Sequence, residues 1–126
     1  MDAMNKQHLW GAALLIWGII ILILTIIPGE AMVQPSGHGT RFRWDYPEHF
    51  AAYFLLALFY YLWRRNSYHF QIKRDFRILI IAGLAASAGT EVLQLLVPNR
   101  AFNPIDMGFN ALGIAAMALL WRFALR

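Results

Sequence analysis

The stretch GTEVLQLLVPNRAFNPIDMGFN, residues 89–110, holds the features that decide the fold of this chain. One apolar run ends here and another begins, with a short turn rich in Pro, Asn and Arg between them. Both runs are long enough to cross a bilayer, yet they carry Glu91, Gln94, Asp106 and Asn110. An acid at the centre of a membrane helix costs about 2.5–3.5 kcal/mol on insertion scales, so such side chains face a protein interior and its partners.

The rest of the chain has the composition of a small membrane protein. Of its 126 residues, 60% are hydrophobic and only 14% are charged, too few charges for an ordinary soluble domain. Four apolar segments predict helices at about residues 9–27, 47–63, 77–97 and 104–122, and about 20 residues span a bilayer. We therefore predict an all-α integral membrane protein, a single domain over residues 1–126, with four transmembrane helices in an antiparallel bundle. The first segment exceeds the core of a signal peptide, so we expect it to be retained.

The basic residues predict the orientation of this bundle. Eight belong to the chain ends or to the connection between the second and third segments: Lys6, Arg64, Arg65, Lys73, Arg74, Arg77, Arg122 and Arg126. The opposite side has three: Arg41, Arg43 and Arg100. The positive-inside rule then places the N- and C-termini in the cytoplasm. Basic residues beside apolar segments also explain the net charge of +4 without nucleic acid, and the absence of cysteine excludes disulfides.

Two further features predict lipid contact and packing. Four tryptophans fall near the ends of segments, as interfacial anchors do: Trp10, Trp44, Trp63 and Trp121. Small residues predominate between Gly83 and Thr90 and allow neighbouring backbones to approach closely.

Helical spacing brings the polar side chains of three segments onto faces that meet. Residues four or seven apart share one face of a helix, and the short turn at residues 98–103 makes the third and fourth helices antiparallel neighbours. Glu91 then lies about six residues, about 9 Å, below the turn at Pro98, and Asn110 lies about four residues, about 6 Å, below Asp106, at similar depth. We predict one polar pocket in the outer half of the membrane, with Glu48 as a secondary member and seven main residues: His49, Tyr53, Glu91, Gln94, Arg100, Asp106 and Asn110.

Plainer explanations exist for several of these residues. Glu48 and Asp106 fit ordinary helix starts after a proline, and Asn103 with Asp106 approximates a capping box. Asn and Gln side chains also hold membrane helices together without any further role. Arg100 could pair with Asp106, bind an anionic head group, or be a solvated loop residue.

His49 has two alternative roles. An imidazole transfers protons near neutral pH and could be oriented by Glu91 or Glu48. It could also bind a metal together with Glu91 and Asp106. The spacing of these residues matches no known zinc motif, so we expect neither a metal nor a cofactor.

Two motifs resemble a known family. PEHFAAYFLLALFYYL, residues 47–62, is similar to its D-K-x-x-H-F-x-x-Y-x-x-L segment, although Asp45-Tyr46-Pro47 departs from the usual Asp–Lys pair. EVLQLLVPNRAFNPIDMGFNALG, residues 91–113, resembles its signature E-x-x-Q-x-x-x-P-x-R-x-x-x-x-x-D-x-x-x-N-x-x-G. All seven positions match: Glu91, Gln94, Pro98, Arg100, Asp106, Asn110 and Gly113. This is the VanZ-like family of small bacterial membrane proteins.

The resemblance implies a multi-pass protein of the bacterial inner (cytoplasmic) membrane, part of the cell envelope, with a link to antibiotic resistance against teicoplanin. It implies no reaction, so catalytic residues and enzyme activity stay open, as does the oligomeric state. Our hypothesis is that the pocket binds a lipid-linked or head-group ligand, such as a lipid-linked cell-wall precursor, among the membrane lipids. One alternative is a membrane-embedded hydrolase or transferase using His49 and carboxylates, with Ser87 or Thr90 as the nearest hydroxyls. Another is a structural or partner-binding helical subunit.

Overall fold

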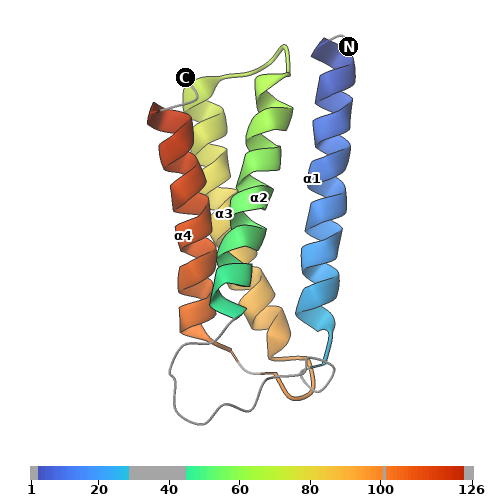
Figure 1. Ribbon diagram of the computed structural model, residues 1–126, viewed down its shortest axis with the longest axis vertical. Helices are drawn as coiled ribbons and strands as arrows, with labels where there is room; N and C mark the ends of the chain where they lie inside the picture. The colour runs from blue at the N-terminus through green and yellow to red at the C-terminus, as the bar shows by residue number, and fades with distance from the viewer. Residues whose placement is uncertain (1–2, 29–44, 101, 124–126) are drawn as a thin grey trace.

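The computed structural model describes residues 3–28, 45–100 and 102–123, which form four α-helices and no strand. The helices are α1 (Ala3–Ile26), α2 (Asp45–Arg65), α3 (Ile72–Gln94) and α4 (Pro104–Phe123). Figure 1 shows them along one long axis, with both chain ends and the α2–α3 connection at the same end, so consecutive helices run in opposite directions. The all-α prediction is confirmed for the described residues.

Three helices, α1, α3 and α4, are long and apolar enough to cross a membrane. The apolar side chains of α1 are largely exposed, as lipid-facing residues are, among them Leu15, Ile16 and Ile19. Helix α2 has 21 residues but carries Glu48, His49 and several tyrosines. It packs against both α1 and α4. The prediction of four membrane-spanning helices is therefore confirmed for three by length and composition.

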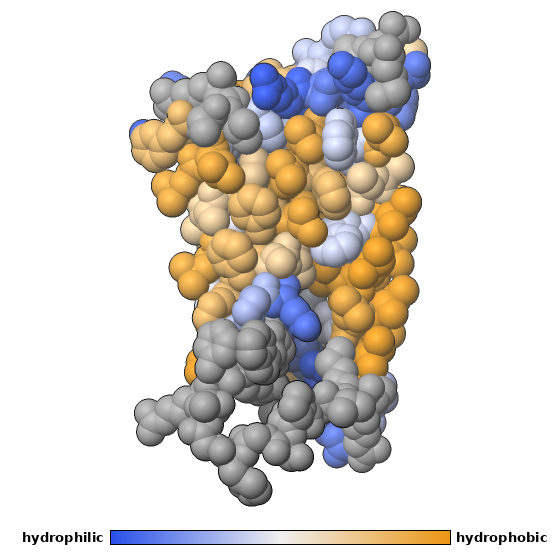
Figure 2. Space-filling view, in the orientation of Figure 1, coloured by the Kyte–Doolittle hydropathy of each residue, from blue (hydrophilic) through white to orange (hydrophobic). Residues whose placement is uncertain are grey.

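Helix α3 begins at Ile72, earlier than the predicted residue 77, because Asp75 organises its first turn. The buried Asp75 carboxylate accepts the backbone N–H of Gln71 at 2.8 Å. It also lies 3.3 Å from Nε of Arg64, at the end of α2, and 3.3 Å from Nε of Arg74. Because Asp75 is paired with both arginines, the helix can start with polar residues. The pair with Arg64 also links the end of α2 to the start of α3. Hydrophilic residues gather at this end of the molecule (Figure 2).

Helix α3 ends at Gln94, earlier than the predicted residue 97. The N–H groups of Leu95, Leu96 and Val97 bond to carbonyls three residues back, which tightens the chain into turns. Pro98 follows, and Asn99 adopts a left-handed conformation with φ 58°. Asn tolerates this conformation better than most residues, so the chain reverses here and enters α4.

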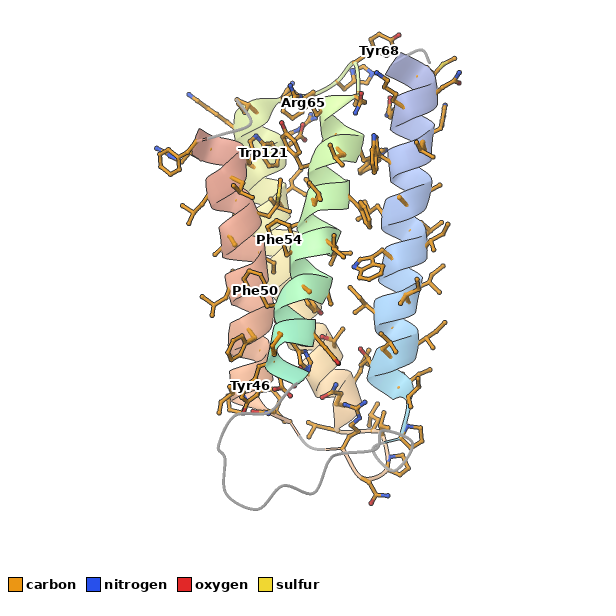
Figure 3. All side chains as sticks on the ribbon, viewed as in Figure 1. Tyr46, Phe50, Phe54, Arg65, Tyr68 and Trp121 are labelled. Atoms are coloured by element: carbon orange, nitrogen blue, oxygen red, sulfur yellow. The ribbon has the colours of Figure 1, made fainter. Side chains whose placement is uncertain are left out.

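Trp121 lies inside the bundle, so its prediction as an interfacial anchor is wrong. It is 1% exposed, and its ring centroid lies 4.8 Å from that of Tyr61, 5.6 Å from Phe76 and 6.0 Å from Phe70. Figure 3 shows it near the end of α4 that lies beside the α2–α3 connection. Trp10 and Trp63 are half-buried, and Trp44 lies outside the described residues. Trp121, Tyr61, Phe70 and Phe76 thus form an aromatic cluster that fills the interior at the end of the bundle opposite the predicted pocket.

Helices α2 and α4 pack closely at Gly113. A Cβ atom placed there would lie 2.3 Å from the carbonyl oxygen of Phe50 and 2.9 Å from the backbone nitrogen of Phe54. Both phenylalanines are labelled on α2 in Figure 3. Because only a residue without a side chain fits, the two backbones touch here. His49 and Asn110, each less than one turn from this contact, are thereby brought together.

Candidate functional site

The imidazole of His49 is held between two residues of α4. Its Nδ1 lies 3.0 Å from Oδ1 of Asn110, and its Nε2 lies 3.6 Å from Oδ2 of Asp106. An amide oxygen only accepts hydrogen bonds, so Nδ1 carries the proton and donates. In the neutral ring Nε2 then has the free lone pair, and it faces Asp106.

Glu91 is the most enclosed acid in the described part of the chain, with no exposed surface. Its Oε2 accepts the backbone N–H of Asn103 at 3.3 Å. Its Oε1 is buried and has no hydrogen-bond partner among the described residues. One ligand-type atom each from His49, Glu91 and Asp106 lies within 4.8 Å of the other two. Helices α2, α3 and α4 therefore each bring one ionisable group to the same point.

The first turn of α4 joins this cluster to α3. Oδ1 of Asn103 accepts the backbone N–H of Ile105 at 3.0 Å, so Asn103 is the N-cap, as predicted. In a capping box the acid three residues later accepts the N–H of the cap residue. Here Glu91 of the neighbouring helix accepts it, while the carboxylate of Asp106 faces His49. Simple helix initiation therefore does not account for the position of Asp106.

Tyr53 connects α2 to α3 one turn further into the bundle. Its hydroxyl lies 2.7 Å from Oγ1 of Thr90 and 3.1 Å from the carbonyl of Ala86, either of which can accept its proton. Thr90 also donates to the carbonyl of Ser87. The hydroxyl of Ser87 lies 3.5 Å from the carbonyl of Met107. Among the described residues neither hydroxyl bonds to His49, so no Ser–His or Thr–His pair of a hydrolase is formed.

A pocket of about 120 Å³ opens beside this cluster. Six of the predicted residues line it: Glu48, His49, Tyr53, Glu91, Gln94 and Arg100. Asp106 and Asn110 are not part of the lining and contact His49 from α4. The structure therefore brings all eight predicted residues to one region at the end of the bundle far from the chain ends.

Helix α1 also lines the pocket, which the sequence did not reveal. It contributes Ile21, Leu24 and Thr25. Thr25 is buried and donates to the carbonyl of Ile21. A signal was present, since Thr25 is the one hydroxyl in the apolar second half of this helix.

Arg100 lines the pocket and forms hydrogen bonds to the end of α1. Its Nε donates to the carbonyl of Ile27 at 3.2 Å, and an Nη donates to that of Leu24 at 3.4 Å. The carbonyls at the end of a helix have no partners within it and carry partial negative charge, so an arginine suits this place. The interpretation of Arg100 as a solvated loop residue is wrong, because it is half-buried and bonded to α1.

Comparison with known proteins agrees with the resemblance noted in the sequence. A model of the VanZ/LLP1 family matches residues 10–125, nearly the whole chain and every pocket residue. No curated protein and no solved structure matches the chain.

Proposed function

The chain belongs to the VanZ/LLP1 family, and from that premise we propose that this membrane protein binds an amphiphile. The polar head group enters the pocket beside Glu91, and the hydrocarbon tail lies along α1. One observation carries the proposal: the polar pocket continues into an apolar groove. Ile21, Tyr53 and Thr90 line both.

The groove has the size and chemistry of a lipid-tail site. Its volume is about 490 Å³, and its other lining residues are almost all apolar: Gly11, Leu14, Leu15, Gly18, Ile19, Leu22, Leu56, Trp63 and Ala86. In Figure 2, hydrophilic residues reach the surface in the lower half of the molecule, beside the apolar column of α1. A water-soluble ligand would need the pocket alone, whereas an amphiphile uses both parts.

The pocket offers several hydrogen-bonding groups to a head group. Glu48 and Gln94 accept bonds from hydroxyl or amine groups, and Gln94 and Arg100 donate to oxygens. The basic residues lie mostly at the other end of the bundle, and by the positive-inside rule this supports a pocket in the outer half of the membrane. Lipid-linked cell-wall precursors are amphiphiles of the required kind, so one of them is our proposed ligand.

Filling the groove should prevent binding. Gly18 lines the groove, and a Cβ there would meet nothing within 4 Å, so Gly18→Leu is expected to fold. We expect about tenfold weaker binding of a lipid-linked wall precursor, measured by native mass spectrometry of the purified protein, because a tenfold change needs only about 1.4 kcal/mol.

Gly89→Leu is the matched control, since it adds the same side chain in open space on α3 outside the groove. Equal binding by both variants would contradict the proposal. Cleavage of the precursor by the wild type in the same samples would replace binding by the hydrolase alternative.

A second consequence concerns glycopeptides. Bacteria that express the wild type should become less susceptible to teicoplanin if the protein sequesters a wall precursor. We expect Glu91→Ala to abolish this effect at unchanged membrane abundance. Glu91 lines the pocket and also accepts the backbone N–H of Asn103 at the start of α4. Val92→Ala, at the neighbouring exposed position of α3 outside the pocket and the groove, should retain it. Loss of effect only in proportion to loss of protein would instead support the structural alternative.

A further inference from the structure

We propose that His49, Glu91 and Asp106 form a binding site for a divalent transition-metal cation such as Zn²⁺ or Mn²⁺. The inference goes beyond lipid binding and does not depend on it. It also departs from the expectation of no metal, which rested on spacing along the chain. The three ligands come from three different helices, so no spacing within one segment could have revealed the site.

The distances within the cluster suit a shared ion. The three ligand atoms lie within 4.8 Å of one another, and Nε2 of His49 lies 3.6 Å from Oδ2 of Asp106. A metal with nitrogen and oxygen ligands at about 2.0–2.2 Å holds those atoms about 3–4.4 Å apart. Small side-chain rotations therefore close the ligand set around one ion.

The buried oxygen of Glu91 independently points to a ligand. Glu91 has no exposed surface, and its Oε1 has no hydrogen-bond partner among the described residues. A carboxylate oxygen buried without a donor is costly, and a bound cation removes that cost. Oε2 is already oriented by the N–H of Asn103, which leaves Oε1 as the oxygen available to the ion.

The hydrogen bond from His49 to Asn110 prepares the imidazole for a metal. Histidine ligands usually donate their second ring N–H to a fixed acceptor, which sets the tautomer and the ring orientation. Oδ1 of Asn110 has this role at 3.0 Å, and it leaves the lone pair of Nε2 facing the carboxylates. Asn110 is fully buried, so the acceptor is held firmly.

The ligand types favour a transition metal over Mg²⁺ or Ca²⁺. One imidazole and two carboxylates suit Zn²⁺ or Mn²⁺, whereas Mg²⁺ and Ca²⁺ prefer oxygen ligands alone. A doubly charged cation also neutralises the two carboxylates. Three protein ligands leave at least one coordination position for water or a ligand oxygen, and His49 and Glu91 line the pocket from which it would come.

Metal binding by the purified protein tests the site directly. Tag-free protein in detergent is stripped with a chelator, equilibrated with ZnCl₂ or MnCl₂ without added lipid, and analysed for metal by mass spectrometry. We expect about one ion per chain for the wild type and at least tenfold weaker binding by Glu91→Gln, since second-shell changes alone cost about 10–100-fold. Glu48→Gln is the matched control, because Glu48 lines the pocket but is exposed and outside the cluster; it should bind as the wild type does.

If Glu91→Gln fails to fold, unfolding temperatures measured with and without metal still test the site. The metal should raise the unfolding temperature of the wild type and of Glu48→Gln, since a ligand of the folded state stabilises it. Asp106→Asn should lose that increase. The proposal is overturned if the wild type binds no ion, if Glu91→Gln and Asp106→Asn bind as tightly as the wild type, or if Mg²⁺ or Ca²⁺ binds in preference. Since no amphiphile is added, these outcomes are separate from the fate of the lipid proposal.

Discussion

Replacing Gly113 by alanine should strongly destabilise the protein, although it adds a single methyl group. The new Cβ would lie 2.3 Å from the backbone oxygen of Phe50, and a backbone atom in a helix cannot move aside as the end of a flexible side chain can. The two helices must separate, which breaks the packing between α2 and α4. Overpacking of this kind costs about 1–3 kcal/mol and sometimes more, and we expect the upper end, about 3 kcal/mol. The loss is measurable as the free energy of unfolding in SDS titrations.

Gly108→Ala provides the matched control on the same helix. A Cβ at Gly108 would meet nothing within 4 Å, and alanine favours a helix over glycine by about 0.5–1 kcal/mol. The two substitutions should therefore change stability in opposite directions. Similar stability of both variants would show that α2 and α4 do not touch at Gly113. Because His49 and Asn110 flank the contact, Gly113→Ala should also separate the two residues that orient the site.

Trp121→Ala should be nearly as damaging, at the other end of the bundle. The indole is 1% exposed and packs on Tyr61, Phe70 and Phe76, so its removal leaves a large cavity. Buried Phe or Trp to Ala changes cost about 3–5 kcal/mol. In lipid the transfer part is smaller, since hydrocarbon also accepts the ring, so we expect about 3 kcal/mol in the same SDS titrations.

Phe123→Ala is the control for this position. Phe123 is also an aromatic residue of α4, two positions further on, but it is 74% exposed. Its removal should change stability by less than about 0.5 kcal/mol, as surface changes usually do. Equal losses for both variants would mean that Trp121 contacts lipid, as an interfacial anchor does.

The sequence by itself determined the four helices and the residues that cluster at one end of the bundle. Helices are visible because the length of an apolar run and its flanking polar residues are local properties. The cluster was visible because Glu91, Asp106 and Asn110 are costly in lipid, and because helical spacing says which of them share a face. Helix ends were less accurate, since Asp75 is stabilised by Arg64 from another helix.

Only the tertiary structure decided how those residues are connected. The N–H of Asn103 bonds to Glu91, Arg100 bonds to the carbonyls at the end of α1, and Trp121 turns inward rather than toward lipid. In its second half α1 differs from a lipid-facing helix only by Thr25, yet it forms one wall of both the pocket and the groove. The physical reason is that lipid is as apolar as the helix surfaces, so hydrophobicity does not say which face of a helix meets a neighbour. That choice depends on close packing at points such as Gly113 and on polar groups finding partners, both of which exist only after the helices have come together.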